Sequence, residues 1–76
     1  MPERERVWLE RDEPYITLGQ LLKLVGIIRT GGQAKRFLAE NRLTVNGQPE
    51  SRRGKKLVPG DTVEVDGAGT FIVDRK

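Results

Sequence analysis

The spacing of the apolar residues changes at Leu43, and this change restricts the fold more than any other feature of the chain. Between residues 17 and 42, apolar residues recur three and four positions apart, as they do along one face of an α-helix. From Leu43 onward they alternate with polar residues, which is typical of a half-buried β-strand. We therefore expect an α+β fold in which two short helices (a helical hairpin) pack on a small, mostly antiparallel β-sheet.

The first helix is expected over residues 18–25. Thr17 and Gln20 form a capping-box sequence, in which each side chain accepts a hydrogen bond from the other residue's backbone amide. Gly26 can end the helix in the left-handed conformation. The apolar stripe of this helix consists of Leu18, Leu21, Leu22 and Val25.

The second helix is expected near residues 31–40, after a very short connection. Thr30 and Gln33 repeat the capping-box spacing, and Asn41 is a natural terminator. Its apolar stripe consists of Ala34, Phe37 and Leu38.

Strands are expected before the first helix and after the second helix. Asn46-Gly47 predicts a tight hairpin turn, and Pro49 confines the strand after that turn to an edge of the sheet. Residues 51–56 are expected to form a loop, with Lys55 and Lys56 exposed to solvent. The other expected strands are residues 6–10, 43–45, 62–66 and 70–74.

Basic residues are concentrated in the middle of the chain. The net charge is +3, but residues 23–56 hold nine Lys or Arg and only two acids, Glu40 and Glu50, whereas both ends are net acidic. The run Arg52-Arg53-Gly54-Lys55-Lys56 contains no acid. Like charges this close repel one another unless a polyanion lies across them, so the run favours nucleic-acid binding over a merely solvated face.

The chain has no Cys and no His, which excludes disulfides, thiolate or imidazole metal sites, and Ser/His or Cys/His catalysis. We expect no catalytic residue, no metal and no cofactor. The longest apolar stretch, residues 24–28, is far too short to span a bilayer. We therefore expect a cytoplasmic monomer without a membrane partner.

The start of the second helix is a second candidate feature. Gly31 and Gly32 carry no side chains that would keep a phosphate away from the amides of the helix start, and Arg29 and Lys35 lie nearby in the sequence. The alternative is that a glycine here only relieves crowding between the two helices.

The four aromatic residues are sparse for a nucleic-acid binder. Phe37 and Phe71 are expected in the core, Trp8 is expected to pack on Ile72, and the sequence does not assign a place to Tyr15. Without an aromatic platform, base stacking should be minor.

Taken in their order along the chain, these motifs resemble the S4-like domain, the RNA-binding domain first described in small-subunit ribosomal protein four. The resemblance covers residues 16–66 and rests on Val45-Asn46-Gly47 and Pro59-Gly60-Asp61-Thr62-Val63 after two short helices. Gly31 to Lys35 and Arg52 to Leu57 are similar to small stand-alone bacterial members, the YaaA/YbcJ-like group.

The resemblance implies a non-enzymatic module that grips structured RNA, such as ribosomal or tRNA-like RNA, on or near a ribosomal subunit. Many members begin the first helix with Arg-Leu-Asp, whereas this chain has Thr17-Leu18-Gly19, so contacts made by that Arg do not transfer. With Gly31 and Gly32, the expected RNA-binding residues are Arg29, Lys35, Arg36, Arg52, Arg53, Lys55 and Lys56.

Three other functions remain open from the residues. A protein-interaction or ribosome-assembly docking domain could use the same basic residues on an acidic protein. A β-grasp-like carrier would need a C-terminal Gly-Gly, whereas this sequence ends Asp74-Arg75-Lys76. An enzyme with a bound metal is the most distant alternative.

Overall fold

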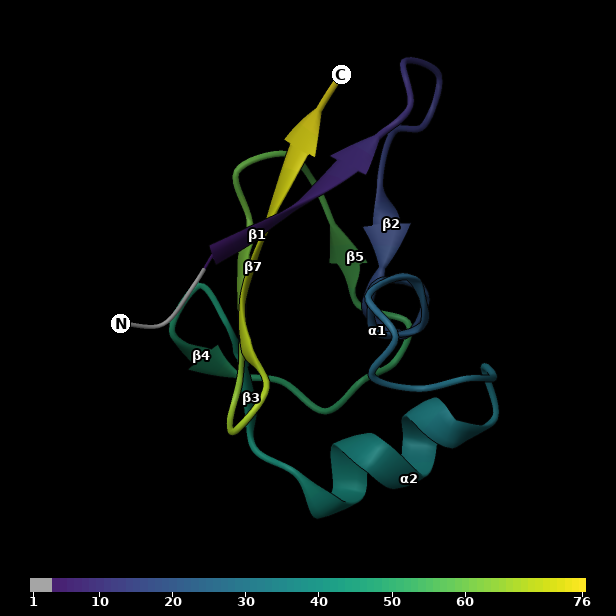
Figure 1. Cartoon of the computed structure of the whole chain (residues 1–76), viewed down its shortest axis with the longest axis vertical. Coiled ribbons are helices and arrows are strands. Elements are labelled where there is room, and N and C mark those ends of the chain that lie inside the picture. The colour runs from purple at the N-terminus through teal and green to yellow at the C-terminus, as the bar shows by residue number, and fades with distance from the viewer. Residues whose placement is uncertain (1–3) are drawn as a thin grey trace.

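A computed structural model describes residues 4–76 of the protein. The α+β fold predicted from the sequence is confirmed, and Figure 1 shows the arrangement. The elements of the described residues are β1 (Arg4–Leu9), β2 (Ile16–Thr17), α1 (Leu18–Leu24), α2 (Gln33–Glu40), β3 (Leu43–Val45), β4 (Gln48–Pro49), β5 (Lys56–Leu57), β6 (Thr62–Val65) and β7 (Gly69–Arg75).

Within residues 4–76, the main sheet has five strands in the order β1-β7-β6-β3-β4. All of its pairs are antiparallel except β1 and β7, which run parallel, with Val7 opposite Val73. The mostly antiparallel sheet is therefore confirmed. Asn46 and Gly47 both have positive φ, at 52° and 82°, as the predicted hairpin turn requires. Pro49 lies in the edge strand β4, where it removes no inner ladder bond.

A second sheet of two short strands was not predicted. Ile16 of β2 pairs with Leu57 of β5, and Thr17 pairs with Lys56. The expected loop over residues 51–56 was wrong at its end, because Lys56 belongs to β5. Strands of two residues are too short to show the alternation by which a strand is predicted from sequence. In the structure their pairing brings together two buried residues, Ile16 and Leu57.

Helix α1 begins as predicted. Gln20 donates its amide to Thr17 Oγ1 at 3.3 Å, and Thr17 donates its amide to Gln20 Oε1 at 2.9 Å, which completes the capping box. The helix ends one residue before the predicted limit, with Val25 as its C-cap and Gly26 at φ +83°. The terminator Gly26 is therefore confirmed.

Helix α2 differs from the prediction at its start. It begins at Gln33 rather than at residue 31, and no side chain caps it. Only the glutamine half of the expected capping box forms, since Gln33 Oε1 accepts from the amides of Arg29 and Thr30. Gly31 and Gly32 form a turn instead, because glycine loses more conformational freedom than other residues when it becomes helical. The connection from residue 25 to 32 is therefore longer than predicted.

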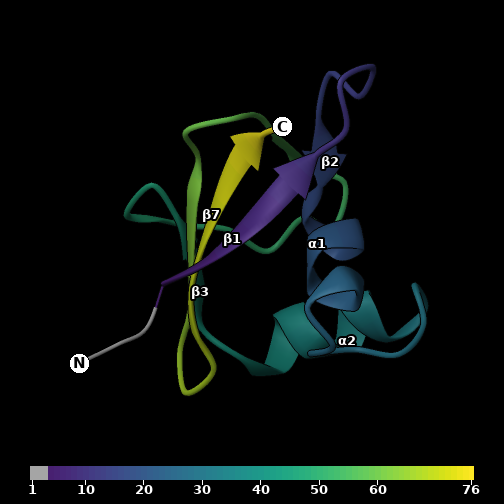
Figure 2. The ribbon, with the colours of Figure 1, turned by 45° about the horizontal axis from the view of Figure 1, so that its top comes forward.

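The core lies between the helices and one face of the main sheet. In Figure 1, α1 is seen nearly end-on while α2 lies across the view, so the helices form a corner, and Figure 2 shows both on the same side of the sheet. No helix among residues 4–76 is long and apolar enough to cross a membrane. The largest fully buried side chains are Leu9, Leu18, Leu21, Leu22, Leu57, Val63 and Val73.

Candidate nucleic-acid interface

The segment of residues 52–56, here called the basic loop, is attached to the start of α1 by backbone hydrogen bonds. The Leu18 amide donates to the Lys55 carbonyl and the Gly19 amide donates to the Arg53 carbonyl, both at 2.9 Å. The first amides of a helix have no partner within that helix. The basic loop supplies partners for two of them, so its backbone is held beside α1.

Gly19 makes this attachment possible. A Cβ atom at this position would lie 3.4 Å from the Arg53 carbonyl oxygen, 3.5 Å from Arg53 Cβ and 3.6 Å from Ala34 Cβ. A long side chain here would therefore separate α1 from both the basic loop and α2. No pattern in the sequence indicated this contact. The only signal in the sequence was that Thr17-Leu18-Gly19 departs from the Arg-Leu-Asp of many S4-like domains, so that Gly19 stands where they have the larger Asp.

Some of the predicted RNA-binding residues line two adjacent hollows in the surface. Gly31, Arg53 and Gly54 line one hollow together with the first residues of α1. Gly54 also lines the second hollow, whose other residues are Arg52, Lys55 and Lys56. We call the set Gly31, Arg52, Arg53, Lys55 and Lys56 the basic surface.

The other predicted residues lie outside these two hollows. Arg29 and Gly32 are exposed in the connection before α2, and Lys35 is exposed on α2. Arg36 is exposed too, but its Nε donates to Glu40 Oε1 at 2.7 Å. The charge of Arg36 is therefore already paired with an acid one helical turn away.

Arg52 is also paired, which corrects the expectation that no acid neutralises the loop. Arg52 Nε donates to Glu50 Oε2 at 3.1 Å, and Nη2 donates to Glu50 Oε1 at 3.2 Å. Glu50 also accepts from the backbone amides of Ser51 and Arg52, and its side chain is only 13% exposed. The hydrogen bonds from Arg52 lower the pKa of Glu50 to about 2, and the same pair raises the pKa of Arg52.

The two lysines of the loop differ from each other. Both were expected to face solvent, but Lys55 is half-buried. The physical reason is that the Lys55 carbonyl bonds to α1, which brings this residue against the helix start. Lys56 is exposed, and its Nζ lies 4.9 Å from the centre of the Tyr15 ring. Lys56 and Arg53 are therefore the exposed cations of the basic surface that form no ion pair with an acid among residues 4–76.

The glycines before α2 are not required by packing. A Cβ on Gly31 would meet nothing within 4 Å, and one on Gly32 would meet only Thr30 Oγ1, at 3.9 Å. The alternative interpretation, in which a glycine relieves crowding between the helices, is therefore wrong for both positions.

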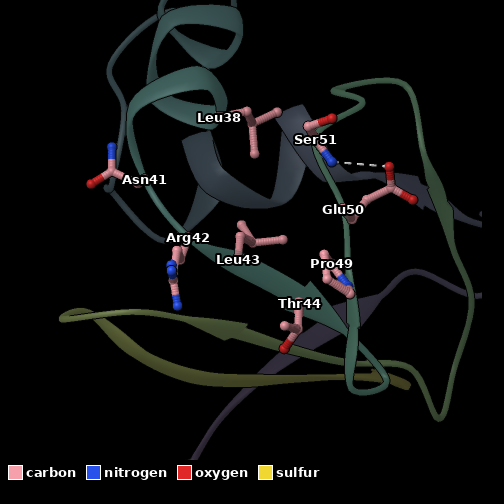
Figure 3. A pocket seen from close by; sticks show the side chains of 8 residues that line it. All are labelled: Leu38, Asn41, Arg42, Leu43, Thr44, Pro49, Glu50 and Ser51. Atoms are coloured by element: carbon pink, nitrogen blue, oxygen red, sulfur yellow. Dashed lines mark hydrogen bonds between the residues drawn. The ribbon is translucent and has the colours of Figure 1, made fainter.

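A further hollow, not predicted from the sequence, lies beyond the end of α2 (Figure 3). Asn41 and Arg42 lie on one side of it, and Glu50 and Ser51 lie on the other. The Asn41 side chain is engaged, since its Nδ2 donates to the Phe37 carbonyl at 2.9 Å. Within residues 4–76, no group of three carboxylates is placed to hold a metal ion.

Comparisons with known proteins place the chain in a family. Residues 9–73 match the S4 domain. The chain is 53% identical over 62 residues to "Probable ribosome maturation protein RlbA" of Bacillus subtilis (strain 168). The matched region covers 82% of this chain and 87% of the relative. It is 40% identical over 60 residues to "Putative RNA-binding protein YbcJ" of Escherichia coli (strain K12), covering 79% of this chain and 86% of the relative. This chain therefore belongs to the S4 domain family.

Proposed function

We propose that this protein is a non-enzymatic RNA-binding module that grips structured RNA through the basic surface. Its family and the names of its relatives, an RNA-binding protein and a ribosome maturation protein, support this function. The observation that carries the proposal is the attachment of the basic loop to α1 through the Arg53 and Lys55 carbonyls. A loop that is ordered before binding loses less conformational entropy when the RNA docks.

The cations of the surface would bind the RNA backbone. Lys and Arg side chains neutralise phosphates and release condensed counterions. Such contacts position the protein without reading bases, so the shape of the folded RNA should dominate recognition. Arg29 and Lys35 are exposed and would extend the contact toward α2. Gly31 and Gly32 leave open space above their backbone, where a phosphate could approach the start of α2.

We propose further that the RNA is ribosomal or tRNA-like and that the protein acts in the cytoplasm as a monomer. The ribosome maturation name of one relative supports ribosomal RNA and contact with a ribosomal subunit. The second candidate function is docking on an acidic protein during ribosome assembly. The same name favours it, and the same basic surface would serve it.

A salt-dependent titration with a folded ribosomal RNA fragment tests the proposal. With roughly four to six phosphates neutralised, log K against log salt should have a slope on the order of −3 to −5. Binding that is absent at about 50 mM salt, or that does not depend on salt, would contradict RNA binding through this surface.

Charge reversal identifies the surface. The double variant Arg53→Glu and Lys56→Glu should bind at least about tenfold more weakly and show a shallower salt slope, because two phosphate contacts are lost. Arg4→Glu is the control for a single reversal and is compared with Arg53→Glu alone, since β1 begins on the opposite side of the molecule from α1 (Figures 1 and 2). Equal losses in Arg53→Glu and Arg4→Glu would mean that only net charge matters. Retained RNA binding in the double variant would move the site elsewhere.

A further inference from the structure

Tyr15 is an exposed aromatic side chain next to the basic surface. The residue is 38% exposed, and the Lys56 ammonium lies 4.9 Å from the centre of its ring. Lys56 also lines a hollow with Arg52 and Lys55. The ring therefore lies beside cations that the proposed function assigns to phosphates.

The backbone on both sides of this contact is fixed. Ile16, which follows Tyr15, is buried and pairs with Leu57, while Thr17 pairs with Lys56. The two-stranded sheet therefore fixes the backbone that directly follows Tyr15 beside the strand that carries Lys56. A tyrosine has only two side-chain torsions, so little conformational entropy is lost when its ring becomes a contact surface.

The other aromatic residues do not combine exposure with this position. Phe71 is buried, and Phe37 is packed against the core. Trp8 is exposed on the edge strand β1, where the Arg6 guanidinium lies 5.7 Å from its ring centre and forms an ion pair with Asp74. On the neighbouring strand β7, the residue opposite Trp8 is Asp74.

We propose that Tyr15 and Lys56 form a subsite for one unpaired RNA nucleotide, whose base stacks on the exposed surface of the Tyr15 ring while its phosphate meets the Lys56 ammonium. This subsite rests on the proposed RNA-binding function and adds a contact with a base to it. Every base has an aromatic face, so stacking tolerates any sequence. Within a duplex both faces of a base are covered, so the subsite takes a nucleotide from a loop, a bulge or an end.

The experiment uses two RNA hairpins with the same stem. One carries an unpaired nucleotide, and the other carries an abasic residue at that position, which keeps the phosphate and removes the base. Wild type, Tyr15→Phe and Tyr15→Leu are titrated with both. Because none of these proteins differs in charge, any change in affinity comes from the side chain at position 15 or from the base.

The subsite predicts a specific pattern of affinities. Tyr15→Leu should bind the intact hairpin between about fivefold and a hundredfold more weakly, which is the range for loss of one base stack, whereas Tyr15→Phe should stay within about twofold. Wild type should bind the abasic hairpin more weakly than the intact hairpin by a similar factor. Tyr15→Leu should bind the two hairpins with equal affinity. Tyr15→Leu is checked for folding by circular dichroism. The comparison of the two hairpins on wild type needs no variant at all.

The outcomes separate the subsite from the function on which it rests. If wild type binds neither hairpin, RNA binding itself is overturned. If wild type binds both hairpins equally and with the expected salt dependence, the function stands and the subsite is overturned. A loss in Tyr15→Phe as large as that in Tyr15→Leu would also overturn stacking, because the hydroxyl would then carry the contact.

Discussion

The side-chain amide of Asn46 donates a hydrogen bond to Asp61 across 2.9 Å, although the two residues are 15 positions apart. Asn46 Oδ1 also accepts from the Thr62 amide at 2.9 Å, and the second carboxylate oxygen of Asp61 accepts from the Val58 amide at 2.8 Å. The Val-Asn-Gly and Pro-Gly-Asp segments that carried the family resemblance are therefore one hydrogen-bonded unit. It joins the β3–β4 turn to the start of β6.

This unit predicts a graded loss of stability at Asn46. Asn46→Ala removes two side-chain hydrogen bonds, each contributing about 1 kcal/mol, and places alanine at a positive φ that costs roughly 1 kcal/mol more. Asn46→Gly removes the same bonds but tolerates the backbone angle. Urea unfolding should therefore rank wild type above Asn46→Gly and Asn46→Gly above Asn46→Ala. Equal losses in the two variants would contradict the contribution of the backbone.

The pair of Glu50 and Arg52 predicts how stability depends on pH. The folded-state pKa of Glu50, about 2, lies below its ordinary value of 4.5. A carboxyl whose pKa is lowered by folding stabilises the fold above its unfolded pKa, and this contribution is lost as pH falls through the interval toward the folded pKa. Wild type should therefore exceed Glu50→Gln in unfolding free energy at pH 7, and the difference should shrink between pH 4.5 and about 2.

Urea unfolding of both proteins at several pH values measures this difference. Because Glu50→Gln keeps the size of the side chain, packing changes little between the two proteins. A difference that stays constant down to pH 2.5 would mean that the carboxylate charge does not contribute.

Gly19 should tolerate one added carbon but not a long side chain. In Gly19→Ala the new Cβ would lie at ordinary contact distances, and the helix could gain up to about 1 kcal/mol, so stability and RNA affinity should be retained. Gly19→Leu must displace the Arg53 segment, so it should weaken RNA binding clearly while the helical circular dichroism signal persists. Full RNA affinity in Gly19→Leu would show that attachment of the basic loop is not needed.

Gly32→Ala should separate stability from RNA binding. Gly32 has φ −66°, which alanine adopts without strain, and its new Cβ would meet only Thr30 Oγ1. Replacing glycine at a compatible position restricts the unfolded chain, so stability should stay equal or rise by up to about 1 kcal/mol. If a phosphate approaches this turn, RNA affinity should fall in the same variant.

Lys35→Ala is the companion variant for this test. Its side chain is exposed on α2, so it should weaken RNA binding with little change in melting temperature. A Gly32→Ala protein that binds RNA at full strength would rule out a phosphate at this position.

The sequence by itself determined the features that depend on near neighbours. The capping box of Thr17 and Gln20 and the positive-φ turn at Asn46 involve residues at most three positions apart, so local spacing is sufficient to predict them. The alternation that buries Val63 and Val65 follows from the two-residue period of a strand. The predicted start of the second helix was wrong, because a capping-box spacing does not reveal whether two glycines will join the helix or form a turn.

Only the tertiary structure decided which distant segments meet. The parallel pairing of β1 with β7 and the pairing of β2 with β5 join opposite parts of the chain. The contact of Gly19 with Arg53 decides where the basic loop lies, and Tyr15 reaches Lys56 through the same folding. Glu50 and Arg52 are close in sequence, yet the backbone conformation that the fold imposes between them decides that they pair. Burial of a shared core selects these contacts, because strands of two residues and single glycines carry too little local preference to do so.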